Sequence, residues 1–196
     1  MLVIAMETRS LPSGPMRWAG RRHDDDRPDA SSGASSAELF DTVFRALHDG
    51  EQVALGFDCP LSAPADQGRA ADGTDALLGL AEPAVTRPGI AELGQVLEEL
   101  GRWRPWTRVS TSLPRWKANT SILVWEAVPA EGAEGIAASV AADSFFRQLH
   151  TPAEHGQEAP GRPVVNLAAA VAYRAGLLAD ASELARPVAS VAVAGG

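Results

Sequence analysis

The chain has 196 residues, a formal net charge of −8, 45% hydrophobic residues and 21% charged residues. This length and apolar content predict one globular domain over residues 1–196, and the acidic balance excludes a general nucleic-acid coat protein. With a single cysteine, Cys59, no intramolecular disulfide can form. The N-terminus has no basic leader with a long apolar core, and no segment is apolar over the length of a bilayer, so we expect a cytoplasmic protein without membrane contact.

Two short apolar runs at the start of the chain predict an N-terminal antiparallel hairpin. The runs begin at Leu2 and Met16, on either side of a turn-forming cluster at residues 11–15. The polar residues 21–36 are expected to form a mobile loop, with room for a weak third strand.

The first helix is predicted from its cap and its periodicity. Ser35 and Glu38 have the spacing of a capping box, and apolar residues recur at helical intervals until Gly50. A buried strand follows over residues 53–58, because an apolar run there ends on Asp58 and Pro60 prevents its continuation.

The second half of the chain alternates loops, helices and strands. Residues 61–89 are rich in proline and glycine and predict a long mobile loop with a short helix at 75–80, whose role the sequence leaves open. Amphipathic patterns predict helices over 90–101, 135–150 and 164–178, strands over 121–125 and 188–193, and a mobile loop over 151–163. The fold class is therefore α/β: a mixed sheet with an N-terminal antiparallel hairpin, central parallel strands and helices on both faces.

Carboxylates at two strand ends are the candidate catalytic residues. Glu7 and Asp58 each end an apolar strand, and parallel neighbours would bring them together at one sheet edge. A divalent cation such as Mg²⁺ or Mn²⁺ would relieve their repulsion and could support phosphodiester hydrolysis. The alternative is that either acid only caps a turn or a helix.

This order of elements resembles the ribonuclease H-like superfamily. The segments that carry the resemblance are AMET in the first strand, GFDCPLSAP in the strand after the first helix, VWEAVPA, and AADSFFRQL around Asp143. The pattern is most similar to bacterial proteins predicted to be RNase H-like nucleases, in which an Asp-x-Pro turn follows a central strand. The resemblance implies metal ligation by Glu7 and Asp58, with Glu126 and Asp143 as alternative positions for a further ligand.

Residues 102–117 (RWRPWTRVSTSLPRWK) hold four arginines, one lysine and three tryptophans, with no acid. Arginine pairs with phosphates and tryptophan stacks on bases, so this segment could hold nucleic acid or another anionic ligand. The contacting residues would be Arg102, Arg104, Trp106 and Arg108. The alternative is structural, with tryptophans covering the sheet edge and arginines paired with acids.

Three functions are therefore open from the sequence. The first is a metal-dependent nuclease, and the second is a catalytically inactive RNase H-like module that binds a protein or a small anion. The third is an assembly protein in which the alanine-rich helices at 135–150 and 164–178 form a homodimer. A nucleophilic role for Cys59 is not expected, because no histidine is ordered beside it by any motif.

Overall fold

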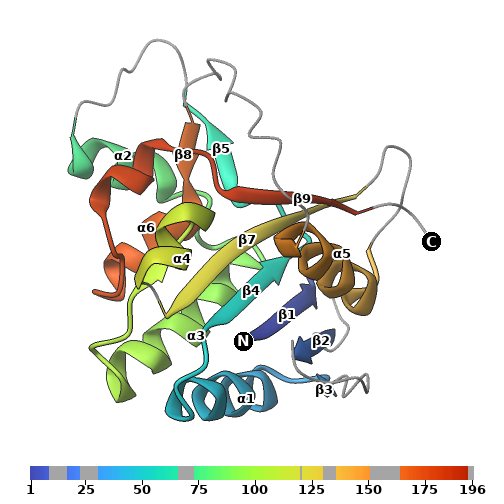
Figure 1. Cartoon of the computed structure of the whole chain (residues 1–196). Coiled ribbons are helices and arrows are strands. Elements are labelled where there is room, and N and C mark those ends of the chain that lie inside the picture. Colours follow the sequence, from blue (N-terminus) through green and yellow to red (C-terminus); the bar gives the residue numbers. More distant parts are fainter. Residues whose placement is uncertain are drawn as a thin grey trace.

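The computed structural model describes residues 1–8, 17–22, 31–65, 73–119, 121–129, 136–150 and 164–193. Figure 1 shows a central sheet with helices packed on both sides. The mixed α/β fold class predicted from the sequence is confirmed.

The main sheet has the strand order β3-β2-β1-β4-β7-β6, with β9 also paired to β7. The strands are β1 (Leu2–Glu7), β2 (Arg17–Arg22), β3 (Ser31–Gly33), β4 (Val53–Phe57), β6 (Val109–Ser110), β7 (Ile122–Pro129) and β9 (Ala189–Val193). The first three strands pair antiparallel, whereas β1, β4, β7, β6 and β9 pair in parallel. The predicted hairpin is thus extended by the weak third strand.

The helices are α1 (Ser36–His48), α2 (Thr74–Ala81), α3 (Ile90–Trp103), α4 (Leu113–Asn119), α5 (Ala138–His150) and α6 (Leu167–Arg174), with a 3-10 helix η1 (Ala181–Ala185). The capping box of α1 is confirmed, because Ser35 Oγ accepts a 3.2 Å hydrogen bond from the Glu38 amide. The Glu38 carboxylate accepts one of 3.0 Å from the Ala34 amide. These bonds satisfy amides at the helix start that would otherwise have no partner.

The alternation of side chains along the strands divides the core into two parts. On the first face, Leu2, Ile4 and Met6 of β1 pack in one cluster with α1, α2, α3 and α6. On the second face, Val3 and Ala5 pack with α5 and α4 in the other cluster. We call these the α3 face and the α5 face; Figure 1 shows α5 in front of the sheet.

Several predicted boundaries differ from the structure. The expected loop at 61–89 contains strand β5 (Ser62–Pro64) as well as α2. The expected helix at 164–178 begins with strand β8 (Val164–Asn166), which pairs antiparallel with β5 in a second, two-stranded sheet. Two consecutive valines favour the strand, and Asn166 caps α6 by accepting a hydrogen bond from the Ala169 amide.

The structure describes only part of the predicted long loops, and it also bears on the prediction that the chain has no membrane span. The loop predicted at 151–163 and half of the one at 21–36, residues 23–30, lie outside the described residues. No helix in the described ranges combines the length and the apolar character needed to cross a bilayer.

Candidate functional site

The backbone brings Glu7 and Asp58 to neighbouring positions at one edge of the sheet. In the parallel pair β1–β4, Met6 lies opposite Phe57, and the Asp58 amide donates a 3.3 Å hydrogen bond to the Met6 carbonyl. The next residue of the first strand, Glu7, is therefore level with Asp58. Both follow apolar runs, and the strands point the same way, so this is the carboxyl edge expected to hold a ligand.

The Asp58 carboxylate is buried, with 3% of the residue exposed, and is held by the end of β1. Its Oδ1 accepts hydrogen bonds of 2.5 Å from both the amide and the hydroxyl of Thr8. Thr8 is itself buried. These two bonds fix the orientation of the carboxylate, because both donors come from one residue of the neighbouring strand.

Glu7 is half-buried and faces the start of α5. Its Oε1 accepts a 3.0 Å hydrogen bond from the Ala138 amide, the first residue of that helix. A negative charge there is favoured by the orphan amides and the dipole of the helix.

Glu7 also lines an open cavity of about 630 Å³ between the antiparallel strands and α5. The cavity is also lined by Arg17, the register partner of Glu7 on β2, and by Glu38 at the start of α1. Ser32 and Ser139 add hydroxyl groups. The cavity therefore places two carboxylates and one guanidinium around a space large enough for a small anionic group.

Sequence reasoning missed Arg17 and Glu38 as cavity residues. Nothing near either residue along the chain resembles a binding motif. They line the same cavity as Glu7 because β1 pairs with β2, β2 pairs with β3, and α1 follows β3 closely in the chain. The lining of this cavity therefore forms only when the three antiparallel strands have paired in the folded protein.

Cys59 lies beside the buried carboxylate and is not activated. The pKa of its thiol is raised from 9.0 to about 11, mainly by burial; a hydrogen bond with Thr8 opposes this rise, and the nearby charges of Asp58 and Glu126 add to it. A thiol with this pKa is neutral near pH 7, so it cannot serve as the nucleophile.

The reactivity of Cys59 should therefore be low. A rise of the pKa from 9.0 to about 11 lowers the thiolate fraction about a hundredfold at pH 8, so alkylation by iodoacetamide should be at least tenfold slower in the native protein than in urea. As the pH rises, the Cys59 thiol ionises at a lower pH in the unfolded chain than in the folded protein. The neutral thiol therefore stabilises the fold fully below pH 9 and progressively less toward pH 11. Equal labelling rates in the folded and unfolded protein would contradict this environment.

Glu126 lies within β7, not at its end as the sequence predicted. The strand continues to Pro129 because β9 pairs with it from Trp125 onward. Glu126 lies opposite Phe57, and its Oε2 accepts a 3.0 Å hydrogen bond from the Leu61 amide. Alternation places Glu126 on the α3 face and Glu7 on the α5 face, so the sheet separates these two acids.

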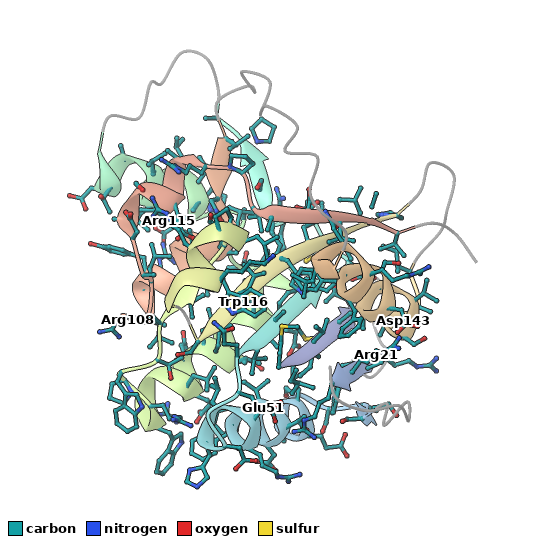
Figure 2. All side chains as sticks on the ribbon, in the orientation of Figure 1. Arg21, Glu51, Arg108, Arg115, Trp116 and Asp143 are labelled. Atoms are coloured by element: carbon teal, nitrogen blue, oxygen red, sulfur yellow. The ribbon has the colours of Figure 1, made fainter. Side chains whose placement is uncertain are left out.

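Asp143, the alternative to Glu126, lies on α5 and forms an ion pair with Arg21 of β2. Figure 2 shows the two side chains meeting at the border of the sheet. Arg21 is opposite Val3, four residues before Glu7. The Asp143 carboxylate is therefore directed toward a different part of β1 from the carboxyl edge.

No three His, Cys, Asp or Glu side chains within the described ranges are grouped closely enough to hold a metal ion. Mg²⁺ in proteins is often bound by one or two carboxylates, with water and substrate phosphate completing its coordination. Glu7 and Asp58 supply two hard oxygen donors at adjacent strand positions, Glu7 on the cavity and Asp58 buried against Thr8.

The Arg/Trp segment lies at the opposite end of the parallel strands. Its residue Val109 begins β6 and pairs with Ile122, the first residue of β7, whereas Glu126 lies four residues further along. The helix α3 connects the two ends: its N-cap, Gly89, lies beside Thr8 and Cys59, and the helix ends in the segment at Trp103. The structure therefore does not bring Arg102, Arg104, Trp106 and Arg108 to the acids.

A second group of buried polar residues, which sequence reasoning did not identify, surrounds Glu183 of η1. This carboxylate is fully buried and accepts hydrogen bonds from the Thr111 amide and hydroxyl, at 2.5 and 2.7 Å, and from the Ser110 hydroxyl at 2.8 Å. Asn166 donates to the Thr111 hydroxyl at 2.8 Å. Arg115 Nη1 lies 3.6 Å from Glu183 and also pairs with Asp180. The group joins β6, β8 and η1, and we interpret it as structural.

Comparison of the chain with protein-family models, with curated proteins and with solved structures returns no match.

Proposed function

We propose that the protein is a divalent-metal-dependent phosphodiester hydrolase whose site lies at the carboxyl edge of β1 and β4. The observation that carries the proposal is the neighbouring position of Glu7 and Asp58 at the ends of two parallel strands, together with the cavity that Glu7 and Arg17 line. The strand order, an antiparallel meander followed by parallel strands, supports the RNase H-like assignment on which this function was predicted.

In this proposal Glu7 and Asp58 would hold Mg²⁺ or Mn²⁺. Bound there, the ion would activate water and stabilise the leaving oxygen. Thr8 would orient the Asp58 carboxylate through its two hydrogen bonds, and the α5 amide at Ala138 would orient Glu7. Arg17 would pair with a phosphate oxygen in the cavity, a role that suits the planar guanidinium.

The proposal is tested by calorimetric titration of Mn²⁺ into the wild-type protein, Glu7→Gln and Asp58→Asn in buffer without phosphate. We expect binding in the wild type and at least a tenfold loss of affinity in each variant, with cleavage of a labelled oligonucleotide lost in parallel. The matched control is Asp143→Asn, whose carboxylate pairs with Arg21 and should leave Mn²⁺ binding unchanged. If Asp58→Asn keeps full cleavage activity, the assignment is wrong.

A second candidate function is a catalytically inactive binding module. The observation that favours it is that Glu7, Asp58 and Glu126 each accept a hydrogen bond from a backbone amide, which is a structural use of a carboxylate. This alternative predicts that neither the wild-type protein nor its variants bind Mn²⁺. It also predicts that Asp58→Asn lowers the melting temperature, because Thr8 loses a charged hydrogen-bond acceptor.

A further inference from the structure

The end of α3 carries an exposed aromatic surface beside α1. Trp103 and Trp106 are 62% and 65% exposed, although most large apolar side chains of the described residues are buried. Phe44 of α1 has its ring centroid 5.7 Å from that of Phe40. Arg104 links α1 to the residues that follow α3, because its guanidinium lies 5.8 Å from the ring centroids of both Phe44 and Trp106.

Arg104 differs from the other arginines of the segment, all of which lie within the described range 73–119. Arg102 pairs with Glu99 at 2.7 Å, Arg108 donates to the carbonyls of Pro105 and Thr107, and Arg115 pairs with Asp180. The Arg104 guanidinium forms neither a hydrogen bond nor an ion pair with the described residues, and its Nε and Nη1 are buried. A guanidinium held between rings in this way keeps a positive charge that no acid of the described residues neutralises.

A groove of about 390 Å³ between α1 and α3 continues this surface. Phe40 and Val96 give it an apolar floor, and Glu99 forms its border with the tryptophans through a 3.3 Å hydrogen bond from Trp103 Nε1. Figure 1 shows the two helices on the same side of the sheet. We define the docking surface as Phe40, Phe44, Val96, Trp103, Arg104 and Trp106.

We propose that this docking surface binds a segment of a partner protein that combines an acidic side chain with apolar ones. The carboxylate would pair with Arg104 as Trp106 turns from the guanidinium toward the partner, and the apolar side chains would cover the tryptophans and enter the groove. Tryptophan and arginine are the residue types that dominate binding energy at protein interfaces.

The charges favour a protein segment over a nucleic acid strand. A phosphate backbone needs several cations, whereas Arg102 and Arg108 already have partners and Glu98 and Glu99 line the groove. The chain as a whole carries −8, which repels a polyanion. A single carboxylate at Arg104 needs only one cation, and it is repelled much less by the acidic chain than a polyanion. The proposal stands whether or not the carboxyl edge is catalytic.

The test is selection of a phage-displayed library of random 12-residue peptides on the wild-type protein. We expect enriched peptides with Asp or Glu beside aromatic or aliphatic residues, and at least a tenfold higher Kd when those peptides are titrated against Arg104→Gln or Trp106→Ala. Arg147 is an exposed residue of α5, on the other face of the sheet. Arg147→Gln is therefore the charge-matched control and should keep the wild-type Kd.

Two further readouts separate docking from a structural role. Arg104→Met should keep or raise the melting temperature, because it removes two buried donors that lack partners, while still losing the selected peptides. The proposal is overturned if no peptide is enriched over a protein-free surface, or if enriched peptides bind the variants as well as the wild type. Displacement of the peptides by a thymidine 12-mer that binds the wild type more tightly would assign the surface to nucleic acid instead.

Discussion

Replacing Gly56 by alanine should destabilise the protein more than the same replacement at Gly20 or Gly33, the other glycines of the described strands. A Cβ atom at this position would lie 2.1 Å from Cζ2 of Trp125, far inside van der Waals contact. Trp125 cannot move away easily, because it is fully buried and its ring stacks on Phe145 with 4.4 Å between centroids. Overpacking costs typically about 1–3 kcal/mol, and we expect the upper end because a central strand must shift.

The measurement is thermal and urea unfolding of Gly56→Ala beside Gly79→Ala. A loss of about 3 kcal/mol corresponds to a melting temperature lower by roughly 6–12 °C in a chain of this length. Gly79 lies within α2 and has nothing within 4 Å of its added Cβ, so alanine there should stabilise by about 0.5–1 kcal/mol. Equal melting temperatures for Gly56→Ala and the wild type would show that the Trp125–Phe145 stack is not packed as described.

The sequence predicted best those elements whose signals are local. The helix α1 has its capping box and its apolar stripe within thirteen residues, and β4 is an uninterrupted apolar run closed by Pro60. Both were predicted near their observed positions. Their burial on the α3 face follows from the same periodicity, since Leu39 and Val43 share one side of the helix.

The sequence did not predict elements that exist only through distant pairing. The strands β5 and β8 have three residues each and join Ser62 to Asn166 across more than a hundred residues. The two-residue strand β6 is held by β7. Such short segments have no periodicity of their own, and their backbone hydrogen bonds depend on partners that only the folded chain provides.

In the candidate site, too, the positions set by local signals were predicted and those set by distant pairing were not. The positions of Glu7 and Asp58 follow from apolar runs that end on acids, whereas the end of β7 was misplaced at Glu126 because its continuation depends on β9. The separation of the Arg/Trp segment from the acids was also beyond local reasoning. It depends on the direction of α3, which begins at the carboxyl edge and ends at the docking surface.

Truncation of Glu183 should be the most costly removal of a polar side chain in the described part of the protein. The carboxylate satisfies the Thr111 amide and the hydroxyls of Thr111 and Ser110 inside the protein, where no water replaces it. Glu183→Ala leaves the Thr111 amide and hydroxyl without this acceptor, leaves the Ser110 hydroxyl only the Ser112 carbonyl at 3.2 Å, and removes an acidic neighbour of Arg115. Breaking such a buried group costs about 3–5 kcal/mol.

The unfolding free energies of Glu183→Ala, Ser110→Ala and the double variant test whether these residues form one network. Once Glu183 is absent, the Ser110 hydroxyl has lost its 2.8 Å acceptor, so removing it should cost less than in the wild type. Glu98→Ala, at an exposed position of α3, is the control and should change stability by no more than about 0.5 kcal/mol. Additive effects of the two substitutions, or a cost below about 1 kcal/mol for Glu183→Ala, would contradict a buried carboxylate that holds β6 against η1.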